Sequence, residues 1–139
     1  MQPGFTITTA AKVVIRFNFY KEDAPVTVAA FAAALPFTRT FFHARVSGQE
    51  IWIDNAPRLD IIQENASVFT EPGEVVIGPV SAPRNKTAGF MGIFYGEGKL
   101  LDCGNIFAKV HPEDAGVFRE LGESIWKKGE QELTFELMP

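Results

Sequence analysis

A two-residue period in the apolar side chains constrains the fold of this chain more than any other feature. Between residues 12 and 20, one set of alternate positions holds Val13, Ile15, Phe17 and Phe19. Because successive side chains of a β-strand point to opposite faces, this segment is expected to be a strand with one buried face. The pattern returns near the C-terminus, where residues 132–137 alternate through Leu133, Phe135 and Leu137.

Further strand-like runs fill much of the remaining chain. We predict strands over residues 41–46, 49–54, 74–77, 90–95 and 106–110. Ser47-Gly48 is a short turn signal between the first two of these runs, and Pro72-Gly73 opens the third. A loop rich in Pro, Asn and Gly is expected over residues 78–89.

Two segments show helical spacing instead. The first begins near Pro25 and ends before Pro36, and its apolar stripe consists of Val28, Phe31, Ala32 and Leu35. The second begins at Pro112, with His111 as its cap, and its stripe consists of Val117, Phe118, Leu121 and Ile125. About eight strands with two helices predict a mostly-β fold, a closed antiparallel β-barrel whose open ends the helices cover.

Length and charge exclude several classes of protein. The chain has 139 residues, and half this length would leave each core marginal, so residues 1–139 are expected to form a single domain. The formal net charge is −4 without a basic stripe, which argues against nucleic acid as a partner. No apolar run approaches the ~18 residues of a membrane span, and the N-terminus lacks a secretion signal. We therefore expect no membrane partner and a cytoplasmic location.

Several short motifs, in their order along the chain, resemble those of cyclophilins. Residues 24–31 read A-P-V-T-V-A-A-F, which resembles the A-P-x-T-V-x-N-F helix start of that family. Residues 42–48 resemble its F-H-R-V-x-x-G strand, and residues 101–110 resemble its L-D-G-x-x-V-F-G-K-V strand. Further matches lie at residues 72–73, 83–85 and 89–90. The chain is most similar to bacterial cyclophilin-like proteins of uncharacterised function, and the resemblance implies a cyclophilin-like β-barrel.

The departures from the cyclophilin pattern lie at the prolyl isomerase site. An alignment without gaps puts Ala44 in the place of the catalytic arginine, and Arg45 takes that place only after a one-residue shift. Trp52 stands where cyclophilins have a glutamine, and residues 87–92 lack the second glutamine. Asn105 is the nearest polar group to the missing tryptophan and histidine of the family. The resemblance thus implies the fold, while little acceleration of prolyl isomerisation is expected.

The hairpin around Ser47-Gly48 predicts a cluster of functional groups. If the loop has two residues, His43 faces Trp52 and Arg45 faces Glu50. Alternation then places these four residues on one outer face with Phe41 and Asp54, and turns to the core Phe42, Ala44, Val46, Ile51 and Ile53. Two interpretations stay open: an ordinary solvent face with one Arg–Glu pair, or a ligand cleft that uses the indole.

Three further residues are expected beside this face as ligand-binding neighbours, namely Glu64, Asn65 and Tyr95. A turn with capping side chains is the preferred explanation of the first two, and an ordinary strand aromatic is the alternative for the third. The single cysteine, Cys103, lies in what reads as an exposed turn over residues 101–105 and is expected to be inert. The two histidines lack metal-ligand spacing, so no metal and no other cofactor is expected.

Three functions remain open at this point. The first is binding of a small planar or carboxylate-bearing molecule, with Arg45 pairing the anion and Trp52 stacking. The second is an enzyme acting on a small amide or cyclic substrate, with His43 or Glu50 as general base and Arg45 stabilising an oxyanion. The third is a prolyl isomerase or peptide-binding module, which the departures disfavour. The sequence also leaves a homo-oligomer open.

Overall fold

The structure is a computed structural model that describes residues 2–81 and 86–139. Its strands are β1 (Gly4–Thr9), β2 (Val14–Phe19), β3 (Phe37–His43), β4 (Gly48–Ile53), β5 (Ala66–Phe69), β6 (Glu74–Ile77), β7 (Met91–Val110) and β8 (Gln131–Leu137). Its helices are α1 (Pro25–Ala34), the short 3-10 helix η1 (Pro112–Asp114) and α2 (Ala115–Lys128). The segment at residues 83–85, which contributes to the cyclophilin resemblance, lies outside the described residues.

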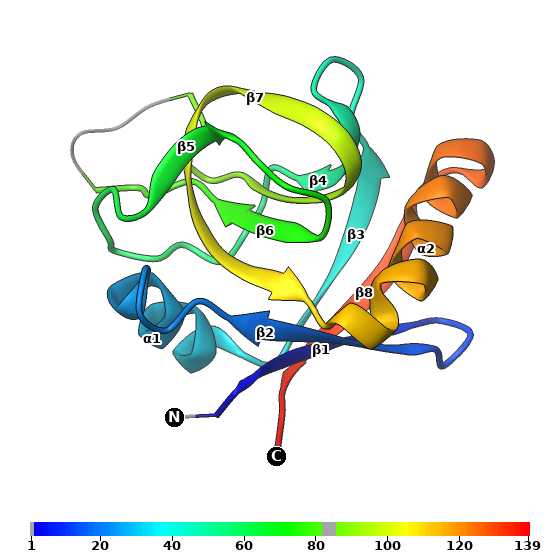
Figure 1. The fold of residues 1–139 in the computed structure, drawn as a ribbon, viewed down its shortest axis with the longest axis horizontal. Coiled ribbons are helices and arrows are strands. Elements are labelled where there is room, and N and C mark those ends of the chain that lie inside the picture. Colours follow the sequence, from blue (N-terminus) through cyan, green and yellow to red (C-terminus); the bar gives the residue numbers. More distant parts are fainter. Residues whose placement is uncertain (1, 82–85) are drawn as a thin grey trace.

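The described strands form one antiparallel sheet that closes into a ring (Figure 1). The order is β2-β1-β8-β3-β4-β7, and β7 pairs again with β2 to complete the ring. β5 and β6 both pair with β7. In Figure 1, α1 lies to the left of the ring and α2 to the right. The predicted class, mostly β with an eight-stranded antiparallel sheet and two helices, is confirmed.

β7 is longer than the sequence pattern predicts. It spans 20 residues, whereas we expected two strands over residues 90–95 and 106–110. The expected turn over residues 101–105 is part of this strand, because β5 pairs with it through Ala66 to Asn105 and Ser67 to Gly104. Cys103 is accordingly half-buried in a strand rather than exposed in a turn.

The apolar stripes of the sequence converge on one main core inside the ring. Alternate residues of β2 are buried, namely Ile15, Phe17 and Phe19. Each helix contributes part of its stripe, Val28 and Phe31 from α1 and Phe118, Leu121 and Ile125 from α2. A second, smaller cluster of buried residues lies apart from this core and consists of Val76, Phe94, Leu100 and Ile106.

Both α-helices lie close to their predicted positions. α1 begins at Pro25 and ends at Ala34, shortly before Pro36. The cap predicted at His111 is confirmed, because its Nδ1 accepts a hydrogen bond from the Glu113 N–H at 3.1 Å, at the start of η1. Neither α-helix in the described ranges is long and apolar enough to cross a membrane.

Arg16 of β2 ties the start of α2 to the sheet. Its Nε donates to Asp114 Oδ2 and its Nη2 to Oδ1, each at 2.9 Å, and its backbone N–H donates to Oδ2 at 2.8 Å. Two parallel bonds between a guanidinium and a carboxylate fix the geometry of both groups. The hydrogen bonds from Arg16 outweigh the effect of burial and lower the pKa of Asp114 to about 2.

This shift predicts a pH dependence of stability. Because the pKa of Asp114 is lower in the folded chain than its ordinary value of 3.8, its stabilising effect is present above about pH 4 and is lost toward pH 2. Asp114→Asn should lower the free energy of unfolding by about 1 to 2 kcal/mol near neutral pH, a range that allows for partial solvation of Arg16. Urea denaturation of both proteins across this pH range measures the difference. The difference should shrink steadily between about pH 4 and pH 2, where Asp114 is half protonated in the folded chain, and a difference that does not shrink would contradict this role of Asp114.

Candidate functional site

The hairpin between β3 and β4 has the predicted antiparallel pairing but a different register. Phe42 pairs with Trp52 and His43 with Ile51, one residue away from the predicted pairing of His43 with Trp52. The loop between the strands spans residues 44–47, four residues instead of two, and a bulge follows it in β4. A shift of one residue exchanges the two faces of a strand. Phe41 is therefore fully buried and Phe42 is 45% exposed, the reverse of our prediction.

This register separates the residues that were predicted to share one outer face. His43 lies opposite Ile51, on the face that turns to the main core. Glu50 and Trp52 alternate with Ile51 and lie on the opposite face of β4, which we call its outer face. Arg45 is exposed in the loop, and the ion pairs of the described residues do not include a pair between Arg45 and Glu50. The predicted placement of the four on one face is wrong, whereas their functional roles stay predictions.

The structure brings His43 together with Tyr95 of β7. His43 Nε2 lies 2.7 Å from the Tyr95 hydroxyl, and Nδ1 lies 2.7 Å from the backbone oxygen of Ala44. Because a carbonyl oxygen only accepts, Nδ1 carries the proton, and a neutral His43 accepts from Tyr95 through Nε2. Burial, followed by the charge of Glu123, raises the pKa of Tyr95 and keeps it a donor. The indole of Trp126 on α2 lies 6.1 Å from the imidazole, so this pair joins α2 to the sheet.

Glu64 caps the first helix. Its Oε1 accepts from the backbone N–H and from the hydroxyl of Thr27, each at 2.7 Å, and Oε2 accepts from the Val26 N–H at 3.2 Å. Burial pushes the pKa of Glu64 upward, but these hydrogen bonds outweigh burial and the pKa is lowered. The capping interpretation therefore accounts for the contacts of Glu64.

Asn65 and Asn105 extend this cluster toward β7. The Asn65 amide donates to the backbone oxygen of Ile106 at 2.8 Å. Asn105 is fully buried, and its Oδ1 accepts from the Glu64 N–H at 3.1 Å. Its amide donates to the Thr27 hydroxyl at 3.1 Å and to the backbone oxygen of Ile62 at 3.0 Å. These polar groups bind one another, so the cluster joins α1 to β7.

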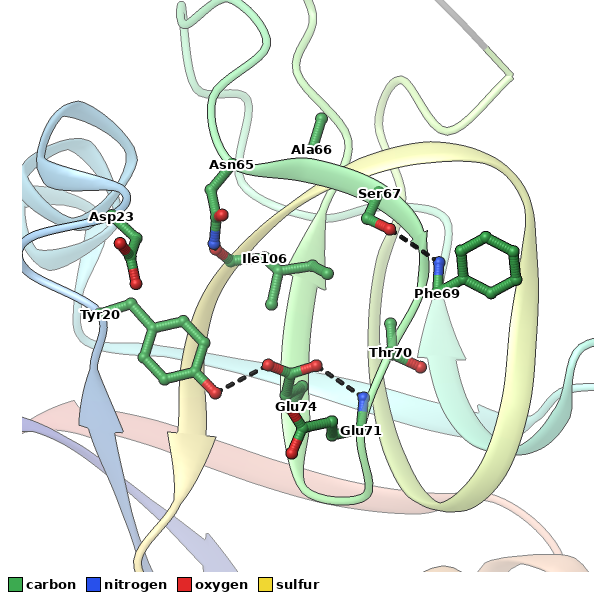
Figure 2. Close-up of a pocket in the computed structure, with 10 residues that line it drawn as sticks. All are labelled: Tyr20, Asp23, Asn65, Ala66, Ser67, Phe69, Thr70, Glu71, Glu74 and Ile106. Carbon is green, nitrogen blue, oxygen red and sulfur yellow. Dashed lines mark hydrogen bonds between the residues drawn. The ribbon is translucent and has the colours of Figure 1, made fainter.

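One pocket has a volume of about 610 Å³ and is lined in part by Tyr20, Asp23, Asn65, Ser67, Glu71 and Glu74. Figure 2 shows the Tyr20 hydroxyl pointing at the Glu74 carboxylate, to which it donates at 2.7 Å. The other Glu74 oxygen accepts from the Glu71 N–H at 2.6 Å. Burial, and then the bond to Glu74, raise the pKa of Tyr20. The buried carboxylate of this pocket therefore has partners on both oxygens without a ligand.

A smaller pocket has a volume of about 210 Å³ and lies between β7 and α2. Its lining includes Tyr95, Val110, Phe118 and Arg119. Of the predicted site residues, Asn65 lines the larger pocket and Tyr95 the smaller, while His43, Arg45, Glu50 and Trp52 line neither. The described residues contain no group of three or more His, Cys, Asp or Glu side chains placed to hold a metal ion.

Glu50 is a carboxyl group buried in the wall of the ring, at 1% exposure. The Ser47 hydroxyl donates to Oε1, while Oε2 is buried and has no hydrogen-bond partner in the part of the chain that the structure describes. Oε2 fills the space that a Cβ would take at Gly92, so only a glycine there leaves room for the carboxyl group. Burial, opposed by the smaller effect of the Ser47 bond, raises the pKa of Glu50 to about 7. Both protonation states are therefore populated at neutral pH.

Three partly exposed rings lie on the outer face beside this carboxyl group: Phe42, Trp52 and Phe90, which we call the aromatic face. Trp52 pairs with Phe42 of β3 on one side and with Gly92 of β7 on the other. Oε2 of Glu50 lies over Gly92, which places it beside Trp52. The rings of Trp52 and Phe90 lie 5.9 Å apart. The sequence pattern indicated Glu50 and Trp52 but missed Phe42, because the two-residue hairpin count turned Phe42 to the core. Phe90 was indicated only by its place in a strand-like run and in the cyclophilin-like match at residues 89–90.

The comparison with known families places the chain without assigning an activity. Residues 6–137 match the family described as "Protein of unknown function (DUF3830)". The chain belongs to DUF3830. No curated protein is significantly similar to this DUF3830 member. Its site therefore has to be argued from its own geometry.

Solved structures share the fold of this DUF3830 member. McbB in complex with tryptophan has 19% identity and a TM-score of 0.76, over 96% of this chain and 44% of McbB, so the chain spans less than half of that protein. The hypothetical protein AF2241 from Archaeoglobus fulgidus has 18% identity and a TM-score of 0.64, over 99% of this chain and 95% of that one. A cyclophilin-type peptidyl-prolyl cis-trans isomerase from Cryptosporidium parvum has 14% identity and a TM-score of 0.57, over 98% and 99%. These likenesses confirm the cyclophilin-like fold.

Proposed function

We propose that the chain binds a small planar molecule on the aromatic face, with the Glu50 carboxyl as the polar group that orients it. The observation that carries this proposal is the buried Oε2 of Glu50, which lacks a hydrogen-bond partner among the described residues and lies beside Trp52. Buried polar atoms are nearly always hydrogen-bonded, so one without a partner calls for an explanation, such as a bound group or a catalytic role. A ligand that reaches Oε2 would supply the missing partner.

The rings around Glu50 suit a flat ligand. Phe42 is 45% exposed. Neighbouring apolar side chains that are exposed on one face favour a binding partner for that face. The indole of Trp52 offers a flat apolar surface, and the ring of Phe90 covers the carboxyl group beside it. A planar molecule stacked on the indole would bury apolar area, and its edge would reach the carboxyl group by displacing the Phe90 ring.

A structural neighbour supports this choice of ligand shape. McbB, which shares the fold, binds tryptophan, a molecule with a planar indole ring. The carboxylate-bearing ligand that the sequence suggested depended on Arg45 beside Trp52. Arg45 is exposed in the loop outside both strands, away from Trp52. This favours a planar ligand over one that is bound through a carboxylate.

General acid–base catalysis at Glu50 is the second candidate function. The observation in its favour is the pKa of about 7 that burial gives this carboxyl group, since a catalytic acid or base works best when its pKa lies near the operating pH. A small amide or cyclic substrate would then exchange a proton with Oε2. Prolyl isomerisation ranks below both, because Ala44 and Trp52 stand in the places of the cyclophilin arginine and glutamine.

The proposal predicts that Trp52→Ala weakens planar ligands. Tryptophan and indole titrated by ligand-observed NMR should bind the wild type, and Trp52→Ala should weaken binding by about tenfold through lost stacking area. Trp126→Ala is the matched control, because it removes another exposed indole, 66% exposed, from α2. Affinity that survives Trp52→Ala, or that falls equally with Trp126→Ala, would place the ligand elsewhere.

The remaining sequence-based expectations are part of this proposal. We infer a cytoplasmic protein with a small-molecule ligand and without nucleic acid or membrane partners, and we leave a homo-oligomer open. The acidic net charge of −4 supports the inference about nucleic acid. Size-exclusion chromatography with light scattering would determine the oligomeric state.

A further inference from the structure

We propose that the ligand of the aromatic face is a planar base, which presents a protonated nitrogen to Oε2 of Glu50. Amidines and amino-substituted nitrogen heterocycles have this chemistry. The inference rests on the proposed function and adds the charge and the donor group of the ligand to it.

The hydrogen bonds of Glu50 define what the ligand has to provide. Oε1 is occupied by the Ser47 hydroxyl, which fixes the orientation of the carboxyl group. Oε2 is left without a partner in the described ranges, and a carboxylate oxygen only accepts hydrogen bonds. The ligand atom that meets the ionised Glu50 must therefore carry a hydrogen, and a charged N–H is the strongest such donor.

Among residues 2–81 and 86–139, no ion pair compensates the charge of the ionised Glu50. The side chains beside it include those of Ser47, Phe90 and Phe94 and that of Trp52 on the same strand face, and none of these four is a cation. The pKa of Glu50 is raised by burial and lowered by the Ser47 hydrogen bond, and no cation contributes to its shift. An anionic ligand would add a second negative charge, whereas a cation would supply the missing counter-charge.

The aromatic face also favours a cation. The face of an indole attracts positive charge more strongly than the other aromatic side chains do. Trp52 stands next to the position above Gly92 that Oε2 occupies, so one planar cation could stack on the indole and contact the carboxylate. The ring of Phe90 borders the same position, its Cζ lying 2.8 Å from the place of a Gly92 Cβ. The ligand therefore reaches Oε2 by displacing the Phe90 ring.

Binding of such a ligand should depend on pH in a defined direction. A planar cation pairs with the ionised form of Glu50, so its affinity should rise as pH increases through the range in which Glu50 loses its proton. A ligand that instead accepts a hydrogen bond from protonated Glu50 would lose affinity over the same range. The sign of the pH dependence thus reports which group of the ligand meets Oε2.

Benzamidine, benzamide and benzoate test the inference, because they share one shape and carry positive, zero and negative charge. We expect benzamidine to bind tightest and to gain about tenfold in affinity between about pH 5.5 and 8.5, as measured by calorimetry. Glu50→Gln should abolish the gain, and its thermal unfolding shows whether the variant is folded. Glu97→Gln, an exposed carboxylate of β7, is the matched control and should keep the gain.

The outcomes separate the inference from the function on which it rests. If benzamide binds as tightly as benzamidine and Trp52→Ala weakens both, planar binding holds and the basic ligand is wrong. An affinity that falls with rising pH, or a gain that survives Glu50→Gln in a folded variant, also overturns the inference. If none of the three compounds nor indole binds, the aromatic face is not a ligand site and both proposals fail.

Discussion

Truncating Phe5 to alanine is expected to lower the free energy of unfolding by about 4 kcal/mol. Phe5 is fully buried in β1, and its ring lies between 5.1 and 6.5 Å from the rings of Phe17, Phe19, Phe31, Phe107 and Phe135. These partners come from three other strands and from α1, so the ring of Phe5 joins elements that are far apart in sequence. Because strand pairing holds the partners in place, they cannot collapse into the cavity left by the substitution.

Urea denaturation measures this effect against two matched variants. Phe5→Leu keeps most of the apolar volume and should lose only about 1 kcal/mol. Phe69→Ala removes the same ring from a site that is 69% exposed, and it should change stability by less than about 0.5 kcal/mol. If Phe5→Ala leaves no folded protein, the stability losses of Phe5→Leu and Phe69→Ala still test the prediction, because Phe5→Leu should lose more. Equal losses in those two would contradict the central place of Phe5 in the core.

Local pattern was enough to predict the elements that carry a strong apolar period. Alternation in β2 placed Ile15 and Phe17 in the core, and both are fully buried. Helical spacing and flanking prolines likewise placed α1 and α2. Each of these elements buries one apolar stripe in the common core, and a short stretch of sequence is enough to show that stripe.

Elements defined by long-range pairing were not predictable in this way. β5 reads A-S-V-F, too short and too mixed for a period, and it exists through its pairing with β7. That pairing in turn makes residues 101–105 part of a strand rather than a turn. Gly98 pairs with Gly48 across the sheet, and a Cβ on Gly98 would collide with the ring of Phe94. Such close approaches follow from the assembled sheet, not from the local sequence.

The candidate site was predicted in part for the same reason. Counting outward from Ser47-Gly48 put Glu50 and Trp52 on one face, which is correct, but it added His43 to that face. The hairpin has a four-residue loop instead of two, and a bulge after Gly48 follows where β4 pairs with β7, about fifty residues farther along the chain. The unpaired oxygen of Glu50 depends on Gly92 and on the depth of burial, and neither can be read from a hairpin count.

Replacing Gly122 by alanine is expected to destabilise the fold by about 2 to 3 kcal/mol, although alanine favours a helix. Gly122 is buried on α2, and its Cβ would occupy the space of the Tyr95 ring. Tyr95 is 4% exposed and its hydroxyl is bonded to His43 at 2.7 Å, so the ring cannot swing aside without breaking that bond. The helix has to shift away from the sheet instead, which weakens the packing of Ile125 and the contact between Trp126 and His43.

Gly116→Ala on the same helix provides a control of opposite sign. Nothing lies within 4 Å of a Cβ at Gly116, so the substitution adds helix propensity without a clash and should stabilise the chain by up to about 1 kcal/mol. Thermal unfolding of the two variants measures the difference, and the fluorescence of Trp126 reports whether α2 has moved. A shift in emission is expected for Gly122→Ala alone, because Gly116 lies two turns away from the contact with Tyr95. If both substitutions stabilise the chain and leave the emission unchanged, α2 does not pack on Tyr95 as closely as described, and the His43–Tyr95 pair does not hold the helix against the sheet.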